Sequence, residues 1–274
     1  MILEPSVSML MSVYSGDKGA FVQEALDSMK NQTYKISEFV IVQDGTVSTD
    51  VLNVLNNFVL ENTNAKLIQL DDNKGLANAL NEGLKYVSNE LVVRVDSDDI
   101  SVPDRVHKEV QMFSKNPKLS VVSGNIREFS ATLEQLQDSR VLPEHHEDLV
   151  RFAQWRSPAN HPAVMFKKSA VEDLHGYANF YRLEDYHLWV RMMMHGRLFA
   201  NIPAVLVYMR TGEGMYKRRG GIKYLLSYFK LRREFKSWGF SSLMQETIAD
   251  ILMVFNVLLP SESRSFIYKK LLRK

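Results

Sequence analysis

The chain has 274 residues, of which 45% are hydrophobic and 24% charged, so it is a folded globular protein rather than a disordered one. It contains no cysteine, which excludes disulfides, thiolate metal sites and a cysteine nucleophile. The net charge of +2 is uneven, because residues 210–274 carry +9 and residues 1–209 carry −7. The basic end predicts an acidic membrane leaflet, a lipid diphosphate or a nucleic acid as partner, unless it is only a solvated face.

The first half of the chain alternates between strand-like and helix-like segments, which predicts a doubly wound, mostly parallel, right-handed α/β sheet. The expected strands are Val7–Tyr14, Phe39–Val42, Lys66–Leu70 and Leu91–Val95, and the expected helices are Phe21–Leu26, Val51–Leu60 and Gly75–Val87. The N-terminal residues Met1–Pro5 show no basic region or cleavage site, so we expect a cytoplasmic protein.

The loops after parallel strands meet at one edge of the sheet, where ligands bind in such folds. We therefore expect Tyr14, Asp44, residues 73–75 and Asp96–Asp99 to share one crevice. The first of these loops, Ser15–Gly19, matches neither the dinucleotide-binding nor the P-loop signature, which argues against an NAD enzyme and a P-loop ATPase.

Three carboxylates, Asp96, Asp98 and Asp99, follow directly on a buried strand and repel one another unless a cation lies among them. Mg²⁺ and Mn²⁺ prefer oxygen ligands and take one or two carboxylates together with substrate phosphates. The cluster therefore predicts a metal-bridged diphosphate, with one of Asp96 and Asp98 on a ribose and the other on the ion. The alternative is an N-cap for a helix that begins near Ser101–Pro103.

Two further polar side chains are candidates for this crevice. Asp44 could accept hydrogen bonds from a base N–H or from ribose hydroxyls, or could belong to an Asp-Gly turn. Lys74 could face a phosphate or be a solvated lysine at a helix start.

The second half offers three more candidates. His161 precedes Pro162 in a loop that enters a strand, and could point at substrate or serve in packing. Glu184 and Asp185 begin a helix over residues 183–192; they either favour the helix dipole or supply a general base that deprotonates an acceptor hydroxyl. One base opposite a metal-bound leaving group suits a single displacement, which inverts the anomeric carbon.

The ordered motifs over residues 5–210 resemble the family 2 glycosyltransferases with the GT-A fold. These motifs are Ser-Val-Tyr at 12–14, Val-Gln-Asp-Gly at 42–45, Asn-Lys-Gly-Leu-Ala-Asn-Ala-Leu-Asn at 73–81, Asp-Ser-Asp-Asp at 96–99 and Glu-Asp-Tyr-His-Leu-Trp at 184–189. The resemblance implies nucleotide-sugar contacts at Asp44 and Asp96, Mn²⁺ or Mg²⁺ on Asp98 with Asp99 beside it, and Asp185 as the base. Tyr14 and Lys74 are further candidates for the nucleotide sugar, and Glu184 for catalysis.

The Gln-x-x-Arg-Trp stretch of processive relatives is absent, which favours a single addition. Residues 208–221 resemble the bacterial O-antigen and exopolysaccharide branch, whose members add a hexose to N-acetylglucosamine on diphosphoundecaprenol. The resemblance implies a UDP-hexose donor, and we expect β-1,3-linked galactose rather than glucose. Lys217, Arg218 and Arg219 could close over diphosphate oxygens or form a basic surface loop.

The basic C-terminal segment, residues 210–274, is expected to be mainly helical and to follow a catalytic domain over residues 1–209. Residues 222–233 mix aromatic and basic side chains, as in helices that lie in a membrane interface. Residues 248–259 are apolar but too few to span a bilayer, so they form either a buried helix or one that lies in a membrane interface, and we expect the buried one. Together with the lipid-linked acceptor that the resemblance implies, these features predict a peripheral protein on the cytoplasmic face of the bacterial inner membrane.

Two other functions remain open from the sequence. A sugar nucleotidyltransferase would want a Gly-rich, basic first loop, which Lys18 alone serves poorly, and would leave Glu184 and Asp185 without a role. A non-enzymatic nucleotide- or nucleic-acid-binding protein would need the basic end to act alone, because the crevice carboxylates repel a polyanion. We therefore expect no nucleic acid partner.

Overall fold

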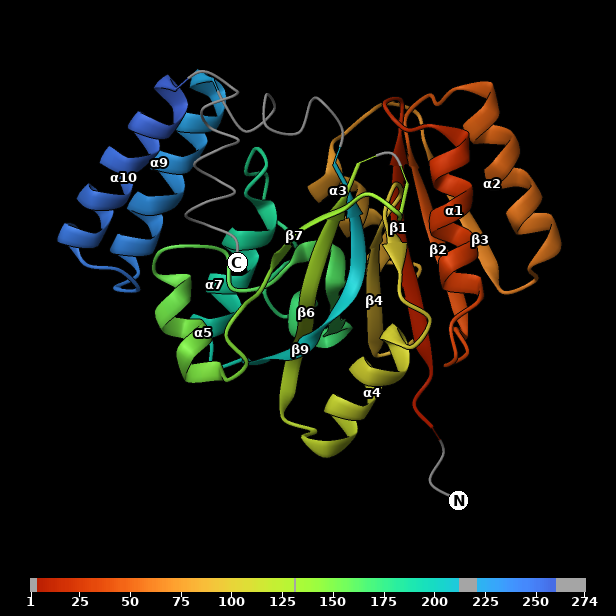
Figure 1. Ribbon diagram of the computed structural model, residues 1–274, viewed down its shortest axis with the longest axis horizontal. Coiled ribbons are helices and arrows are strands. Elements are labelled where there is room, and N and C mark those ends of the chain that lie inside the picture. Colours follow the sequence, from red (N-terminus) through yellow and green to blue (C-terminus); the bar gives the residue numbers. More distant parts are fainter. Residues whose placement is uncertain (1–3, 131, 212–220, 260–274) are drawn as a thin grey trace.

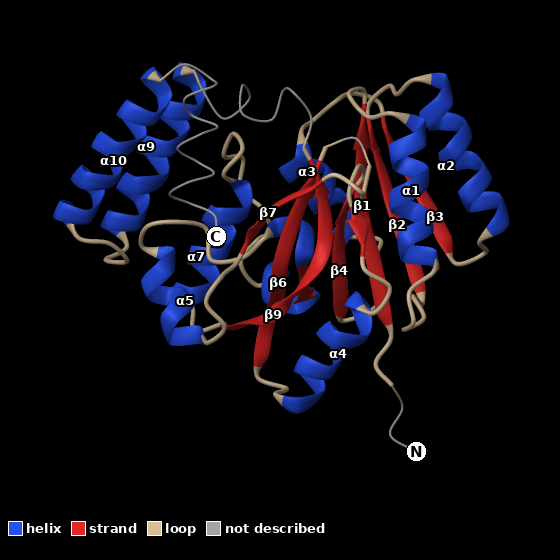
Figure 2. Ribbon diagram, in the orientation of Figure 1, coloured by secondary structure: helices blue, strands red, loops and turns tan. Residues whose placement is uncertain are grey.

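The computed structural model describes residues 4–130, 132–211 and 221–259. Within them, helices cover both faces of one nine-stranded sheet (Figures 1 and 2). The strands are β1 Val7–Tyr14, β2 Glu38–Asp44, β3 Ala65–Leu70, β4 Leu91–Asp96, β5 Ile100–Ser101, β6 Leu119–Phe129, β7 Leu136–Arg140, β8 Val164–Lys167 and β9 Leu198–Arg210. The helices are α1 Gly19–Lys30, α2 Thr49–Glu61, α3 Leu76–Leu84, α4 Arg105–Lys115, α5 His146–Ala153, α6 Lys168–Glu172, α7 Glu184–Met194, α9 Ile222–Ser237 and α10 Leu243–Leu258, with a 3-10 turn η1 at His161–Ala163.

The half of the sheet that carries the expected crevice has the predicted topology. β3, β2, β1 and β4 lie side by side in that order, and every neighbouring pair is parallel. The other half is mixed: β8 is antiparallel to β4 and β6, β9 is parallel to β6, and β5 is antiparallel to β9. The predicted α/β fold is confirmed, although β6, β7 and β9 were not among the expected strands.

Side chains of β1 alternate between two hydrophobic cores, as the two-residue period of a strand requires. Met9 and Met11 belong to the core that includes residues of α1, α2 and α4, and Leu10 belongs to the core that includes residues of α3, α7 and α9. α3 lies close to the sheet at Gly83, where an added Cβ would be 2.5 Å from Leu10 Cδ1. Side chains therefore pack on both faces of the sheet. A ligand is expected at the carboxyl ends of the parallel strands instead.

The helix expected to begin near Ser101–Pro103 begins later. Residues 100–101 form β5 against β9, and the Val102 N–H donates to the Leu206 carbonyl at 3.0 Å. α4 starts at Arg105, and its N-cap residue is Asp104. None of Asp96, Asp98 and Asp99 is therefore the N-cap residue of α4. The alternative explanation of these aspartates as a helix N-cap is wrong.

α9 packs against α7 and shares a hydrophobic core with the sheet. Its buried Phe235 makes an edge-to-face contact with Tyr186 of α7, with ring centroids 5.1 Å apart. Arg232 Nη1 donates to the Gln154 carbonyl at 2.7 Å. α9, the first helix in the described part of the basic segment, therefore shares the core of the sheet domain.

α10 packs against α9 and starts with a capping box between Ser242 and Gln245. The expectation that residues 248–259 are buried is wrong, because Glu246 and Ala249 are the only buried residues that α10 has. Among the described residues, no helix is both long and apolar enough to cross a bilayer.

Candidate active site

The strand register brings the predicted crevice residues together at one edge of the sheet. In the β1–β2 pair Tyr14 lies opposite Asp44, and in the β1–β4 pair Ser12 lies opposite Asp96. All these strands run in the same direction, so the loops that follow them are neighbours. The expected placement of these residues at one edge of the sheet is confirmed, whereas a crevice there and the role of each side chain in it remain predictions.

Asp44 holds the neighbouring loop in place. Its Oδ1 accepts a hydrogen bond from the Lys74 N–H at 2.7 Å, and its Oδ2 accepts one from the Gly75 N–H at 2.9 Å. The turn that follows uses Gly45 at φ +77°, where a Cβ would lie 2.6 Å from the Asn73 nitrogen. A carboxylate can accept about four hydrogen bonds, so Asp44 keeps capacity for a nucleotide while it positions exposed Lys74.

Asp96 is paired with a buried cation that the sequence analysis did not single out. Arg94 of β4 is 1% exposed, and both of its terminal nitrogens donate to the two oxygens of Asp96, one of them at 2.6 Å. A two-pronged pair of this kind fixes the orientation of the carboxylate as well as its charge. Asp96 is therefore held rigidly at the end of β4.

Asp98 and Asp99 lie in an electrostatically unfavourable place for anions. Burial, together with the carboxylates of Asp96 and Asp17, raises the pKa of Asp98 to about 6, although Arg210 acts to lower it. Burial and the neighbouring Asp98 and Asp96 carboxylates raise the pKa of Asp99 well above its usual range. A bound divalent cation would relieve this repulsion.

Arg210, the last residue of β9, contacts residues 96–99, called the acidic loop below. Its backbone N–H donates to Asp99 Oδ1 at 2.8 Å and its Nε donates to the Asp98 carbonyl at 3.0 Å. Its guanidinium lies between the rings of Phe21 and Phe129, at 4.0 and 4.4 Å from their centroids. Because Asp99 is tied to β9 in this way, Asp98 is the better placed of the two for a metal.

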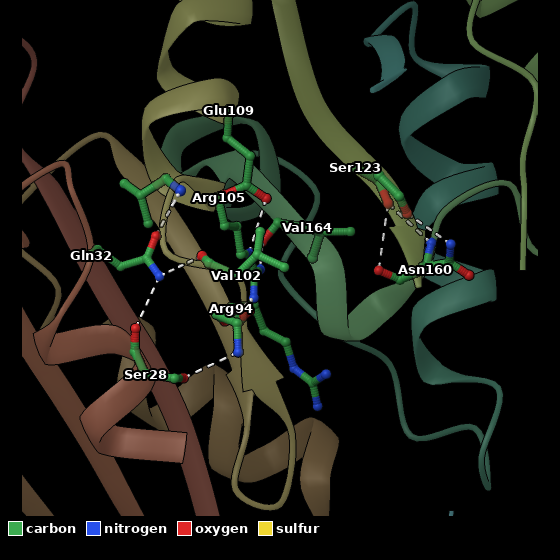
Figure 3. Close-up of polar contacts among 12 residues, drawn as sticks. Ser28, Gln32, Arg94, Val102, Arg105, Glu109, Ser123, Asn160 and Val164 are labelled. Atoms are coloured by element: carbon green, nitrogen blue, oxygen red, sulfur yellow. Dashed lines mark hydrogen bonds and ion pairs between the residues drawn. The ribbon is translucent and has the colours of Figure 1, made fainter. Parts of the chain in front are cut away.

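A second buried arginine supports the loop from behind (Figure 3). Arg105 donates to Ser101 Oγ at 3.1 Å, to the Arg94 carbonyl at 2.9 Å and to the Val164 carbonyl at 3.2 Å. It thereby joins β4, β8 and β5, the short strand that follows the acidic loop. Gln32, which follows α1, adds to this support, because its Nε2 donates to the Val102 carbonyl at 2.8 Å. The acidic loop is thus preorganised, and little ordering is left for the ligand to induce.

His161 lies in an aromatic cluster rather than at the surface. It is 9% exposed, its Nε2 is 3.1 Å from the Tyr177 hydroxyl, and its ring contacts that of Trp189. Burial and the nearby Arg94 charge lower the pKa of His161 well below its usual range, so it is neutral. The structure favours the packing role for His161, and a contact with acceptor remains a prediction.

Glu184 and Asp185 occupy the first turn of α7, as predicted. Burial and the adjacent Asp185 charge raise the pKa of Glu184 to about 7, while Arg94 acts to lower it. Ser157 Oγ lies 3.5 Å from Asp185 Oδ2. The remainder of the motif is structural, because Tyr186, His187 and Trp189 are buried in the core that α7 shares with α9.

Arg94 connects the two acidic groups. It pairs with Asp96, and its charge also acts on Glu184, His161 and Tyr177. Arg94 therefore pairs with the carboxylate that ends β4 and acts electrostatically on Glu184 at the start of α7. The signal for Arg94 was present in the sequence, as a charged residue inside an otherwise hydrophobic strand, and Arg210 gave no comparable signal.

The donor atoms present fit a divalent metal. Asp98 offers a hard oxygen ligand in a place where negative charge is in excess. Within residues 4–130, 132–211 and 221–259, no group of three or more His, Asp or Glu side chains is arranged to hold a metal ion. A metal here would therefore need most of its ligands from a diphosphate and water, as Mg²⁺ usually does. The predicted diphosphate contacts Lys217, Arg218 and Arg219 lie outside the described residues.

Known proteins that this chain is clearly similar to are glycosyltransferases. The model of glycosyl transferase family 2 matches residues 8–184. A UDP-Gal:alpha-D-GlcNAc-diphosphoundecaprenol beta-1,3-galactosyltransferase from Escherichia coli is 36% identical over 270 residues, which is 98% of each chain. The amylovoran biosynthesis glycosyltransferase AmsE from Erwinia amylovora is 30% identical over 96% of this chain and 98% of its own.

Solved structures extend the likeness of the fold. The mannosyltransferase PcManGT from Pyrobaculum calidifontis, in complex with GDP-Man and Mn²⁺, aligns with a TM-score of 0.65 and 17% identity. The alignment covers 98% of this chain and 82% of that one. At this identity the likeness concerns the fold alone.

Proposed function

This chain belongs to glycosyltransferase family 2 and has the GT-A fold, and we propose that it transfers galactose from UDP-galactose, in a β-1,3 linkage, to N-acetylglucosamine on diphosphoundecaprenol. The product would be an intermediate in the assembly of O-antigen or a related polysaccharide repeat unit. The enzyme would work at the cytoplasmic face of the bacterial inner membrane, where such a lipid carrier is embedded. The likeness to the Escherichia coli galactosyltransferase over the whole chain supports the donor, the linkage and the acceptor.

The observation that carries the proposal is the presence of two separate acidic groups, one paired with Arg94 and the other within its electrostatic influence. Asp96 ends β4 and Asp98 and Asp99 follow it, while Glu184 and Asp185 begin α7. A sugar transfer needs one acidic group for the cation that accompanies the diphosphate and a separate base for the acceptor hydroxyl. A sugar nucleotidyltransferase would use the first group and leave the second without a role.

The chain's own residues suggest how the transfer proceeds. Asp44 and Asp96 bind the uridine and ribose, and Tyr14 and Lys74 lie at the same edge of the sheet. Asp98, with Asp99 beside it, would hold Mn²⁺ or Mg²⁺, which would neutralise charge on the UDP leaving group. Asp185 accepts the proton of the acceptor hydroxyl. At the same time the hydroxyl oxygen bonds to the anomeric carbon, and the bond between that carbon and the diphosphate breaks. A single displacement of this kind inverts that carbon.

A donor panel tests this proposal. Purified protein with Mn²⁺ and a synthetic N-acetylglucosamine-diphospho-lipid is given UDP-galactose, UDP-glucose and their N-acetylated counterparts. We expect transfer from UDP-galactose to exceed transfer from the other donors, and NMR of the product to show a β-1,3 linkage. Preferential transfer from UDP-glucose would replace the donor assignment, and a retained anomeric configuration would contradict the single displacement.

The pH dependence separates the two candidate bases. Glu184 has a pKa of about 7, so it loses its negative charge as the pH falls through 7, and the repulsion that makes Asp185 a stronger base falls with it. We expect kcat of the wild type to decline below about pH 7, and Glu184→Gln to keep activity at the low-pH level without that inflection. A Glu184→Gln variant as inactive as Asp185→Asn would instead make Glu184 the base.

A further inference from the structure

The outer face of α10 is apolar and exposed. Its large hydrophobic side chains recur every three or four residues, which places them on one side of the helix. These side chains, called the α10 outer face below, are Met244, Ile248, Ile251, Leu252, Phe255 and Leu258. α10 lies at the edge of the molecule opposite α1 and α2, with α9 beside it (Figure 1).

The polarity of α10 is inverted relative to a helix that faces water. Glu246 is 8% exposed and pairs with Lys236 of α9 at 3.3 Å, and Asp250 is partly buried. A surface helix in water normally turns its acidic residues outward and its leucines inward. Here Leu252 and Phe255 are 60% and 65% exposed. A contiguous exposed patch of this type marks a surface that binds something apolar.

The charges beside α10 identify an anionic lipid surface as the occupant. α9 exposes three further basic side chains, Lys223, Lys230 and Arg233, in addition to Lys236, which pairs with Glu246, and its acidic Glu234 is only partly exposed. An apolar helix face next to basic side chains is the pattern of helices that lie in the interface of an anionic membrane. A second copy of this chain docked on the same face would bring two such basic helices close together.

We propose that the α10 outer face inserts into the interface of an anionic membrane while the basic side chains of α9 contact the lipid head groups. α10 has 16 residues and lies along the surface rather than across the bilayer. α9 connects it to α7, because His187 Nε2 is 2.9 Å from Glu234 Oε2 and Phe235 packs on Tyr186. The helix that carries the base is thereby fixed relative to the membrane. This inference rests on the proposed function, which supplies a lipid-linked acceptor.

Vesicle co-sedimentation of the full chain tests the inference. The vesicles contain phosphatidylethanolamine and phosphatidylglycerol, and the variant is Leu252→Asp/Phe255→Asp. Leu60→Asp serves as the matched control, because Leu60 is 81% exposed on α2, far from α10. We expect the double variant to bind vesicles at least about tenfold more weakly, since two apolar side chains that would insert into the membrane are replaced by charged ones. The control is expected to bind like wild type, and added salt to weaken binding by wild type.

Two acceptors separate this inference from the proposed function. With a short-chain, water-soluble N-acetylglucosamine-diphosphate acceptor, the double variant should keep wild-type kcat/KM, whereas transfer to an acceptor embedded in vesicles should fall. Equal vesicle binding by wild type and double variant would overturn the inference, as would a wild-type dimer that the double substitution dissociates. Intact vesicle binding without transfer to either acceptor would overturn the proposed function and leave the inference standing.

Discussion

Replacement of Asp185 by asparagine is expected to reduce turnover by about 100-fold or more while donor binding stays close to that of wild type. Asparagine has the same shape as aspartate but cannot take a proton from the acceptor hydroxyl. Asp185 lies at the start of α7, whereas Asp44 and Asp96, which we assign to the nucleotide, are the last residues of β2 and β4. The measurement is steady-state kinetics together with calorimetric titration of UDP in the presence of Mn²⁺.

The control for this variant is Asp173→Asn, which makes the same chemical change at the end of α6. Asp173 is exposed and pairs with Arg197 at 2.6 Å. It should keep wild-type turnover. If Asp185→Asn kept wild-type turnover as well, the base assignment would be wrong, and a parallel loss of UDP binding would indicate a role in the donor site instead.

Asp98→Ala is expected to remove the metal-dependent part of UDP binding. We expect affinity for UDP with Mn²⁺ to fall at least about tenfold and turnover to fall further, because loss of a ligand costs metal affinity as well as charge neutralisation. Without metal, wild type and variant should bind UDP equally weakly. Calorimetric titrations with Mn²⁺ and with EDTA give both comparisons.

Metal binding should also depend on pH in a defined direction. Asp98 must lose its proton to coordinate, and its pKa is raised to about 6, so Mn²⁺ affinity should fall as the pH drops through 6. Asp104→Ala is the matched control, since Asp104 pairs with Lys108 just beyond the acidic loop. Equal Mn²⁺-dependent UDP binding by wild type and Asp98→Ala would contradict the assignment.

The sequence allowed the crevice to be placed because strand and helix periods are regular in its first half. Buried strands such as Val7–Tyr14 and Leu91–Asp96 read clearly, and parallel topology then fixes which loops are neighbours. The position of Asp98 relative to Tyr14 and Asp44 followed from this rule alone. The acidic residues of α7 could be identified as a motif, but their proximity to Arg94 could not.

The buried charges were beyond the reach of local patterns. Arg94 and Arg105 are 1% and 0% exposed, and their partners come from elements that the sequence does not order, such as β8. Arg210 was assigned to the basic C-terminal segment, yet its contacts with Asp98 and Asp99 depend on the pairing of β9 with β5 and β6. Such pairings are set by long-range packing.

α10 shows how a composition can mislead. The apolar run at 248–259 predicted a buried helix, because hydrophobic residues usually lie inside. The helix instead lies at the edge of the molecule, and its acidic Glu246 faces α9. A local sequence pattern reports that a face is apolar, whereas the arrangement of α9 on α7 decides whether protein covers it.

The most direct test of the proposed function is the initial rate of galactose transfer from UDP-galactose to N-acetylglucosamine-diphosphoundecaprenol, measured with Mn²⁺ and with EDTA. If Asp98 holds a metal ion, product forms with Mn²⁺, its formation stops in EDTA, and added metal restores it. Unchanged transfer in EDTA would contradict the role of Asp98. No transfer from any UDP-hexose, in protein that binds UDP with Mn²⁺, would contradict the proposed acceptor.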